Sequence, residues 1–295
     1  MAESGIPTCA PYDPSPRRPR LQAPPGACDC HAHVFGPASR YPYSPKRGYT
    51  PPDAPFEAYR HMHDVLGIEC GVFTQPSVYG TDNRAMLDAV ARDPGRLRAV
   101  AAVDADVADR ELRHMHEAGV RGIRVNLVDP GGMPFASFDE LERFAARLAD
   151  LGWHVEFLVH VHEFPDLANR LRALPVDAVV GHLGYMRTSH GLAHEGFRRF
   201  LDHVAEGRCW VKLSGAYRVT TETRALYPDV APFARALIET RPDRMLWGTD
   251  WPHPICPIPM PNDADLLDLL LDWAPDETAR QRILVDNPAQ LYGFA

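Results

Sequence analysis

The stretch Cys28-Asp29-Cys30-His31-Ala32-His33 ends a short apolar run near the start of the chain, and Trp247-Gly248-Thr249-Asp250-Trp251-Pro252-His253-Pro254 ends another near its finish. The spacing of His31 and His33 places two imidazoles on the same side of an extended segment, because side chains alternate with a period of two. A carboxylate at the end of so distant a strand meets them only when the sheet closes on itself. This geometry is typical of a (β/α)8 barrel, whose active-site residues come from the ends of several strands.

Eight apolar runs of strand length follow one another along the chain, over residues 27–34, 68–75, 97–104, 120–128, 153–161, 178–184, 209–214 and 245–251. Between most of them, apolar residues recur at the three- and four-residue spacing of a helix face, as in 83–92, 109–118, 138–151, 164–173 and 230–240. Strands alternating with helices predict a parallel sheet, and eight such units favour its closure into a barrel. An open doubly wound sheet is the alternative, but no glycine-rich phosphate loop follows the first predicted strand.

We therefore predict an α/β fold with a single (β/α)8 TIM barrel over residues 27–295, since barrels of this length form one domain. Residues 1–26 are rich in proline, which fixes φ and cannot donate a backbone hydrogen bond. We expect them to form an extended arm that lies on the barrel or is partly disordered. The proline-rich loop over 35–55 follows the first strand, and it either overhangs the barrel mouth with Tyr43 and Tyr49 or packs as an ordinary surface loop.

Charge and composition exclude several classes of function. The net charge of −8 argues against nucleic-acid binding as the main role. No apolar run reaches the roughly 18 to 20 residues of a membrane span, and no signal peptide is evident. Six cysteines within mostly apolar runs indicate reduced thiols in a cytoplasmic protein. Cys28 and Cys30 invite a metal interpretation, but a buried strand beside His31 accounts for both as core residues.

A third histidine, His182, stands in Val179-Val180-Gly181-His182-Leu183-Gly184 at the end of the sixth predicted strand. One histidine at a strand end is more often structural than catalytic, and Asp250 alone could cap backbone amides. Three histidines and an aspartate that face the same barrel mouth predict an active site. The remaining histidines at 61, 63, 114 and 116 lie in helical patterns and are expected to be solvated, and His253 is expected to support the loop after Asp250.

With these motifs the chain resembles the amidohydrolase superfamily, whose barrels have His-x-His on the first strand and Asp on the eighth. It is most similar to the branch of 2-pyrone-4,6-dicarboxylate lactonase-like enzymes. The matching stretches are residues 30–37, 79–83, 121–126, 153–155, 182–184, 247–254 and 287–288, which together span nearly the whole chain.

The resemblance implies hydrolysis of an activated ester inside a ring. Asp250 would be the general base that takes a proton from water. The three histidines would surround the lactone carbonyl and stabilise its developing negative charge; they are His31, His33 and His182. Substrates of this branch are anionic, and the family positions that bind them are matched here by Arg124, Arg218, Tyr49 and Ser77.

Three positions depart from the family pattern. Pro130 and Tyr185 stand where the dicarboxylate lactonase has arginines, and Leu158 stands where it has a tyrosine. Losing a charge-assisted bond to a ligand weakens binding, so a lactone with one carboxylate, or with another anionic group, fits better than the pyrone dicarboxylate. Arg187 or Arg47 are candidates to compensate.

The expected reaction needs no metal cofactor, although many superfamily members bind zinc. The alternative is one Zn at His31, His33, His160 and Asp250, since His160 shares the strand parity of Leu158 and zinc needs three or four converging N, O or S ligands. A second alternative function is a metal-dependent decarboxylase of an aromatic or dienoic acid. A third is a sugar-acid lactone isomerase. The alternative without enzymatic activity is a binding protein with a barrel fold. The expected partner is a small anionic lactone, without nucleic acid or membrane, and a homo-oligomer is left open.

Overall fold

Eight parallel strands form one sheet in which every strand pairs with its neighbours in sequence order, as predicted. The computed structural model describes residues 5–129, 134–223 and 226–294. The strands are shorter than the apolar runs that predicted them: β1 Cys28–Ala32, β2 Cys70–Thr74, β3 Leu97–Ala101, β4 Val120–Asn126, β5 His154–Leu158, β6 Ala178–Val180, β7 Cys209–Leu213 and β8 Met245–Trp247.

The first and last strands meet just beyond the end of β8 and close the barrel. Ala32 bridges Trp251 in parallel. On either side of this bridge, the amide of Asp250 donates to the carbonyl of His31 at 2.8 Å, and the amide of His33 donates to the carbonyl of Trp251 at 2.7 Å. The two motifs that stand far apart in the sequence are therefore joined backbone to backbone.

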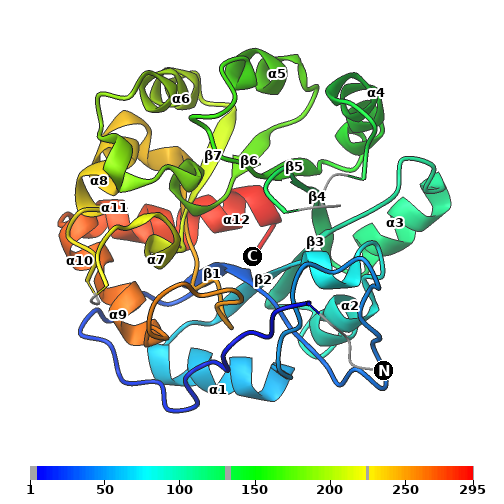
Figure 1. The fold of residues 1–295 in the computed structure, drawn as a ribbon, viewed down its shortest axis with the longest axis horizontal. Coiled ribbons are helices and arrows are strands. Elements are labelled where there is room, and N and C mark those ends of the chain that lie inside the picture. Colours follow the sequence, from blue (N-terminus) through cyan, green and yellow to red (C-terminus); the bar gives the residue numbers. More distant parts are fainter. Residues whose placement is uncertain (1–4, 130–133, 224–225, 295) are drawn as a thin grey trace.

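Most of the helices surround the strands in a ring (Figure 1). The helices are α1 Phe56–Leu66, α2 Arg84–Val90, α3 Asp109–Glu117, α4 Phe138–Ala149, α5 Leu167–Ala173, α6 Glu195–Ala205, α7 Ala216–Val219, α8 Ala231–Thr240, α9 Asp263–Asp268, α10 Leu270–Trp273, α11 Glu277–Gln281 and α12 Asn287–Tyr292. Short 3-10 turns are η1 Ser77–Tyr79, η2 His182–Tyr185, η3 Thr188–His190 and η4 Pro242–Arg244, and η5 Arg282–Asp286 is a π-helical turn. No helix in the described ranges is both long and apolar enough to span a membrane.

The helix α4 shows why these segments fold as they do. Its apolar residues recur at helical spacing, so that Leu141, Phe144 and Leu148 are buried against the barrel. The hydroxyl of Ser137 accepts from the amide of Glu140 and caps the first turn. The strand β5, in contrast, is buried on both faces, as expected for a parallel sheet covered by helices.

The strand β1 contains a bulge that changes which side chains face the barrel interior. Asp29 pairs with Gly71 and Ala32 pairs with Phe73, so three steps along β1 match two steps along β2. A bulge adds one residue and re-aims the side chains that follow. Asp29 consequently faces α1, where its Oδ2 lies 3.4 Å from Nε2 of His63, and the imidazole of His31 faces inward.

The barrel end opposite the candidate site is closed by α12, which Figure 1 shows near the centre of the ring. Tyr292 is fully buried, and its ring lies 5.4 Å from that of His154. The guanidinium of Arg98 donates to the carbonyl of Tyr292 at 3.2 Å and to that of Gly293 at 2.9 Å. Cys28, in the same core cluster, is a buried free thiol beside Cys30, as the core interpretation predicted.

The described part of the arm, residues 5–26, contains no helix and lies against the segment that follows β8. The ring of Tyr12 packs on that of Trp251 at 5.0 Å. Arg17 pairs with Asp265 and Arg20 with Asp268. The domain boundary at residue 26 stays a prediction.

Two local predictions were wrong. The sixth strand ends at Val180, so His182 lies in the following turn with a φ of +50°, and not in the strand. His63 is fully buried, and not solvated, because it lies on the face of α1 that packs against β1, where its side chain contacts Asp29. A helical pattern places a residue on a helix but does not show which face meets the barrel.

Candidate active site

A pocket of 220 Å³ opens at the carboxyl ends of the strands. Every predicted site residue except His31, which lies just beneath it, belongs to its lining: His33, Tyr49, Ser77, Arg124, His182, Arg218 and Asp250. The departures Leu158 and Tyr185 also line it, as does Arg187. Pro130 lies outside the described residues.

Asp250 is the centre of the site. Its side chain is fully buried, and its Oδ1 lies 3.6 Å from Nε2 of His31, 3.6 Å from Nε2 of His33 and 4.0 Å from Nε2 of His182. Among the described residues, Oδ1 has no hydrogen-bond partner. The structure thus brings together the four residues that the sequence singled out, with all three imidazoles aimed at one carboxylate oxygen.

The other oxygen of Asp250 is held by two donors. Its Oδ2 accepts from the hydroxyl of Tyr217 at 2.5 Å and from Nε of Arg218 at 2.6 Å. Burial alone would raise the pKa of Asp250, but Arg218 and the surrounding histidines together outweigh burial and lower that pKa well below its ordinary value. Asp250 is therefore an ionised carboxylate with one oxygen fixed and the other turned toward the histidines.

The backbone at Asp250 is in the left-handed region, with a φ of +65°, which non-glycine residues rarely adopt. Two backbone hydrogen bonds hold this conformation. The amide of Asp250 donates to the carbonyl of His31, and the carbonyl of Asp250 accepts from the amide of His253 at 2.7 Å. Strain of this kind persists where the surroundings fix it, and it is concentrated at functional sites.

The tautomer of His33 follows from its partner. Its Nδ1 lies 2.6 Å from the carbonyl of Thr74, which can only accept, so Nδ1 has the proton and Nε2 presents a lone pair toward Asp250. Burial lowers the pKa of His33, so the ring is neutral. His33 is thus an acceptor beside Oδ1.

His31 lies over a buried ion pair that the sequence reasoning missed. Nζ of Lys212 is 2.5 Å from Oε2 of Glu156 and 3.2 Å from Nδ1 of His31. Nδ1 of His31 also lies 3.3 Å from Oε1 of Glu156, so it is held between a donor and an acceptor of the same ion pair. Burial and then the charge of Lys212 lower the pKa of His31 to about 4.

His182 completes the group from the turn after β6. Its Nδ1 lies 3.0 Å from the hydroxyl of Ser214, which can donate to it and leave the proton on Nε2. Burial lowers its pKa well below the ordinary value. A Cβ on Gly215 would stand 2.7 Å from Nδ1 of His182, so only glycine permits this approach.

A chain of hydrogen bonds extends from Asp250 away from the pocket. The hydroxyl of Tyr217 lies 3.3 Å from Nδ1 of His253, and Nε2 of His253 lies 3.1 Å from Oδ1 of Asp263. All three are buried. His253 therefore supports the loop of Asp250, as expected, through Tyr217 and an aspartate on α9.

The expected substrate-binding side chains surround this centre. Arg124 projects from β4 and donates to the carbonyl of Gln75 at 2.9 Å. Burial raises the pKa of Tyr49, which keeps its hydroxyl protonated as a donor. Tyr43, in contrast, is absent from the pocket lining and packs on Tyr79 with 5.2 Å between ring centroids.

The geometry separates two groups of potential metal ligands. One consists of His31, His182 and Asp250, whose ligand atoms lie within 4.8 Å of one another. The predicted alternative set included His160, and this was wrong: His160 lies past the end of β5 in a different group, with His162 and Glu163. Two imidazoles and a carboxylate are a donor set that a zinc ion accepts, so the central group fits one divalent ion.

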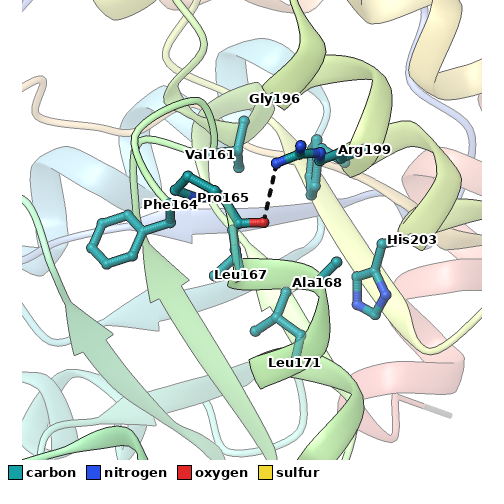
Figure 2. A pocket seen from close by; sticks show the side chains of 10 residues that line it. Val161, Phe164, Pro165, Leu167, Ala168, Leu171, Gly196, Arg199 and His203 are labelled. Carbon is teal, nitrogen blue, oxygen red and sulfur yellow. Dashed lines mark hydrogen bonds between the residues drawn. The ribbon is translucent and has the colours of Figure 1, made fainter.

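A second pocket lies between α5 and α6 and is lined mostly by apolar side chains (Figure 2). Its volume is only 20 Å³, and Arg199 at its rim donates to the carbonyl of Pro165 at 3.4 Å. None of the central histidines reaches it. It is a packing gap between two helices.

Comparison with known proteins agrees with this geometry. Residues 28–294 match the amidohydrolase family model. The chain belongs to the amidohydrolase family. It is 42% identical over 286 residues to a 2-pyrone-4,6-dicarboxylate hydrolase of Comamonas testosteroni, covering 94% of this chain and 93% of the relative.

Two further relatives agree with the predicted branch of this amidohydrolase. A 4-sulfomuconolactone hydrolase of Hydrogenophaga intermedia is 41% identical over 276 residues, covering 93% of this chain and 91% of the relative. A crystal structure of a putative 2-pyrone-4,6-dicarboxylic acid hydrolase from Pseudomonas putida superposes with a TM-score of 0.79 at 32% identity, covering 91% of this chain and 98% of that one. The resemblance read from the motifs is confirmed, and the chain is an enzyme of the amidohydrolase family with lactone hydrolases among its relatives.

Proposed function

We propose that this amidohydrolase opens the ring of a small anionic lactone, with Asp250 as the general base. The observation that supports this best is that the two oxygens of the Asp250 carboxylate have different surroundings. Oδ2 is fixed by Tyr217 and Arg218, whereas Oδ1 faces the Nε2 atoms of three neutral histidines. A base must lie within hydrogen-bond reach of the proton it takes, and Oδ1 borders the pocket where a water would attack.

The tautomers assign different tasks to the histidines. The lone pair on Nε2 of His33 and Oδ1 of Asp250 are two acceptors 3.6 Å apart, within reach of the two protons of one water. His182, with its proton on Nε2, presents an N–H group that stabilises the negative charge developing on the carbonyl oxygen, and Nε2 of His31 lies beside the same carboxylate oxygen of Asp250. Water thus adds to the carbonyl carbon, its proton passes to Asp250, and the ring C–O bond then breaks as that proton moves to the leaving oxygen.

Arg218 connects substrate binding to the strength of the base. In the structure its guanidinium lies on Asp250, which makes that carboxylate a weak base. A substrate carboxylate that draws Arg218 toward itself would weaken this contact, and the pKa of Asp250 would rise toward the range useful for proton transfer. The anionic group of the substrate would therefore activate the residue that attacks it.

The charges lining the pocket indicate the substrate class. Arg124 and Arg218 lie deep in the pocket and suit one carboxylate, and Arg187 lies at the exposed rim. We therefore favour a lactone with a carboxylate on one side and a second anionic group, carboxylate or sulfonate, on the other. The 4-sulfomuconolactone of the relatives and 2-pyrone-4,6-dicarboxylate are the first compounds to test, in that order.

We further propose that the reaction proceeds without a metal cofactor. The two carboxylates of the site are already paired, Asp250 with Arg218 at 2.6 Å and Glu156 with Lys212 at 2.5 Å. A divalent ion held by His31, His182 and Asp250 would add charge beside these cations, and it would act as a Lewis acid on the carbonyl if bound. The fixed cations and the N–H donors supply the same stabilisation from the chain's own residues.

The test is turnover of these lactones by Asp250→Asn, with a neutral lactone of similar size as the control substrate. We expect the variant to bind the anionic lactone but to lose about 10²- to 10⁴-fold in kcat. In H₂¹⁸O, one labelled oxygen should enter the new carboxylate of each product. Substantial turnover by the variant, or an isomerised lactone without label, would refute the proposal.

A further inference from the structure

A cluster of histidines lies on the rim of the barrel, outside the site described above. His160 and His162 follow β5, and His190 and His194 come from the segment between β6 and α6. The ring of His162 lies 5.6 Å from that of His160, 4.3 Å from that of His190 and 5.9 Å from that of His194. The ring of Tyr185 separates this cluster from His182.

Two histidines of the cluster and the neighbouring Glu163 already have ligand atoms close together. His160, His162 and Glu163 each offer one such atom, and these atoms lie within 4.8 Å of one another. Ligands of a shared tetrahedral zinc ion stand roughly 3.4 Å apart. The carboxylate of Glu163 is mostly exposed, so it can close the remaining distance without disturbing the fold.

The hydrogen bonds of His160 leave the correct atom available. Its Nδ1 lies 3.2 Å from the carbonyl of Tyr185, which can only accept, so the proton is on Nδ1 and the lone pair is on Nε2. A histidine that binds metal typically donates its other ring proton to a backbone carbonyl in this way. His160 is thus oriented as a ligand.

His162 supplies a second, independent indication. Its side chain is 10% exposed, yet its Nδ1 has no hydrogen-bond partner in the part of the chain that the structure describes. A buried polar atom without a partner is costly unless something binds it. The backbone of α6 packs closely on His162, because a Cβ on Gly196 would stand 2.6 Å from Cα of His162. Figure 2 shows Gly196 near Val161, which precedes His162 in the chain.

From this arrangement we propose that His160, His162 and Glu163 form a peripheral site for a divalent transition-metal ion such as zinc, with the exposed His190 as fourth ligand. Imidazole and carboxylate donors suit zinc, nickel, cobalt and copper, and not magnesium or calcium, which prefer oxygen. The site is independent of the proposed lactonase reaction.

His194 is excluded from the ligand set, and it provides a matched control. Its Nδ1 accepts from the amide of Gly196 at 3.1 Å, as the N-cap of α6, so its neutral ring has the proton on Nε2 and no lone pair to offer. Asparagine is an equally good N-cap, so His194→Asn removes a histidine of the cluster without disturbing the helix.

The experiment measures zinc binding by competition with a chromophoric chelator, using metal-free protein with His182→Asn so that the central group is disabled. We expect one zinc per chain in this background. His162→Gln and the exposed-residue variant Glu163→Gln should each weaken binding by more than about tenfold, and adding His194→Asn should leave it unchanged. Cobalt in place of zinc should give the absorption bands of a tetrahedral site.

Absence of stoichiometric zinc in the His182→Asn protein would overturn the proposal. Equal weakening by His162→Gln and His194→Asn would do the same, because it would indicate a diffuse histidine patch in place of a site. Glu163 is exposed, so its variant answers the question even if His162→Gln fails to fold.

Discussion

Nε of Arg218 lies 2.6 Å from Oδ2 of Asp250, on the oxygen that faces away from the three histidines. The same guanidinium donates through Nη2 to the carbonyl of Pro254 at 2.7 Å. Arg218 therefore fixes the orientation of the proposed base and lowers its pKa at the same time. The pH dependence of turnover therefore measures the effect of Arg218 on the pKa of Asp250.

Arg218→Met should raise the pH at which activity is lost on the acid side. The base must be ionised, so turnover falls as the pH drops through the pKa of Asp250, and that pKa lies well below 3.8 in the native protein. Removing the positive charge raises it, and the acidic limb of kcat/KM moves upward. Arg187→Met is the control: it should raise KM for an anionic lactone and leave the limb in place. An unshifted limb in Arg218→Met would rule out the electrostatic coupling.

Tyr217→Phe should lower kcat by about tenfold and change KM little, since one hydrogen bond to a charged group contributes roughly 1.5 kcal/mol. The variant loses the 2.5 Å bond to Oδ2 and leaves Nδ1 of His253 without this partner, while the pocket lining keeps its shape. Steady-state kinetics on one anionic lactone measures the effect. Tyr227→Phe, at a buried tyrosine outside the pocket, is the matched control. A change confined to KM would contradict the positioning role.

Lys212→Met should destabilise the fold by about 3–5 kcal/mol, because it leaves the buried charge of Glu156 unpaired. The double variant Lys212→Met with Glu156→Leu should recover much of this loss. Urea unfolding of the native protein, the two single variants and the double variant gives the coupling energy. A loss in the double variant equal to the sum of the losses in the two single variants would show that the pair is not coupled.

The same pair predicts how native stability changes with pH. Burial would raise the pKa of Glu156, but Lys212, His31 and Arg124 together outweigh burial and hold that pKa well below 4.5. A depressed carboxyl pKa stabilises the fold fully above pH 4.5 and ceases to do so as the pH falls through the lowered value. Urea unfolding of the native protein should therefore show decreasing stability below pH 4.5, with a shallower dependence in the double variant. Identical slopes in the two proteins would assign acid sensitivity to other groups.

Removal of metal should leave turnover unchanged, because Arg218 and Lys212 already compensate the two carboxylates near the reaction centre. The measurement is elemental analysis with activity on an anionic lactone before and after chelation. Zinc that leaves with the chelator without loss of activity would belong to the rim. Activity that is lost with the metal and restored by zinc would instead place an ion at His31, His182 and Asp250.

The sequence predicted the barrel and the convergence of its central residues because both follow from simple periodicities. Alternating helical and strand-like runs specify a parallel sheet, and residues just after strands gather at one end of a closed sheet. His33 and Asp250 were therefore placed correctly from position alone. The positions of Tyr49 and Ser77 in the pocket followed only from the family resemblance.

Local backbone detail could not be read in this way. The bulge in β1 moves Asp29 outward and His31 inward, although strict alternation would put them on one face. His160 failed as a central ligand because β5 ends at Leu158, before the parity argument reaches it. Glu156 and Lys212 did leave a signal: each is a lone charge inside an apolar strand, which in a barrel marks an interior pair.

The backbone bridge between Ala32 and Trp251 also has a consequence for how the protein is made. His31 and His33 leave the ribosome early, whereas Asp250 emerges more than two hundred residues later. The site exists only once the last strand has docked against the first, a contact of very long sequence separation that forms late and slowly. The active site is therefore complete only in a fully closed barrel. A nascent chain that ends after the seventh strand contains the histidines of the site but lacks Asp250.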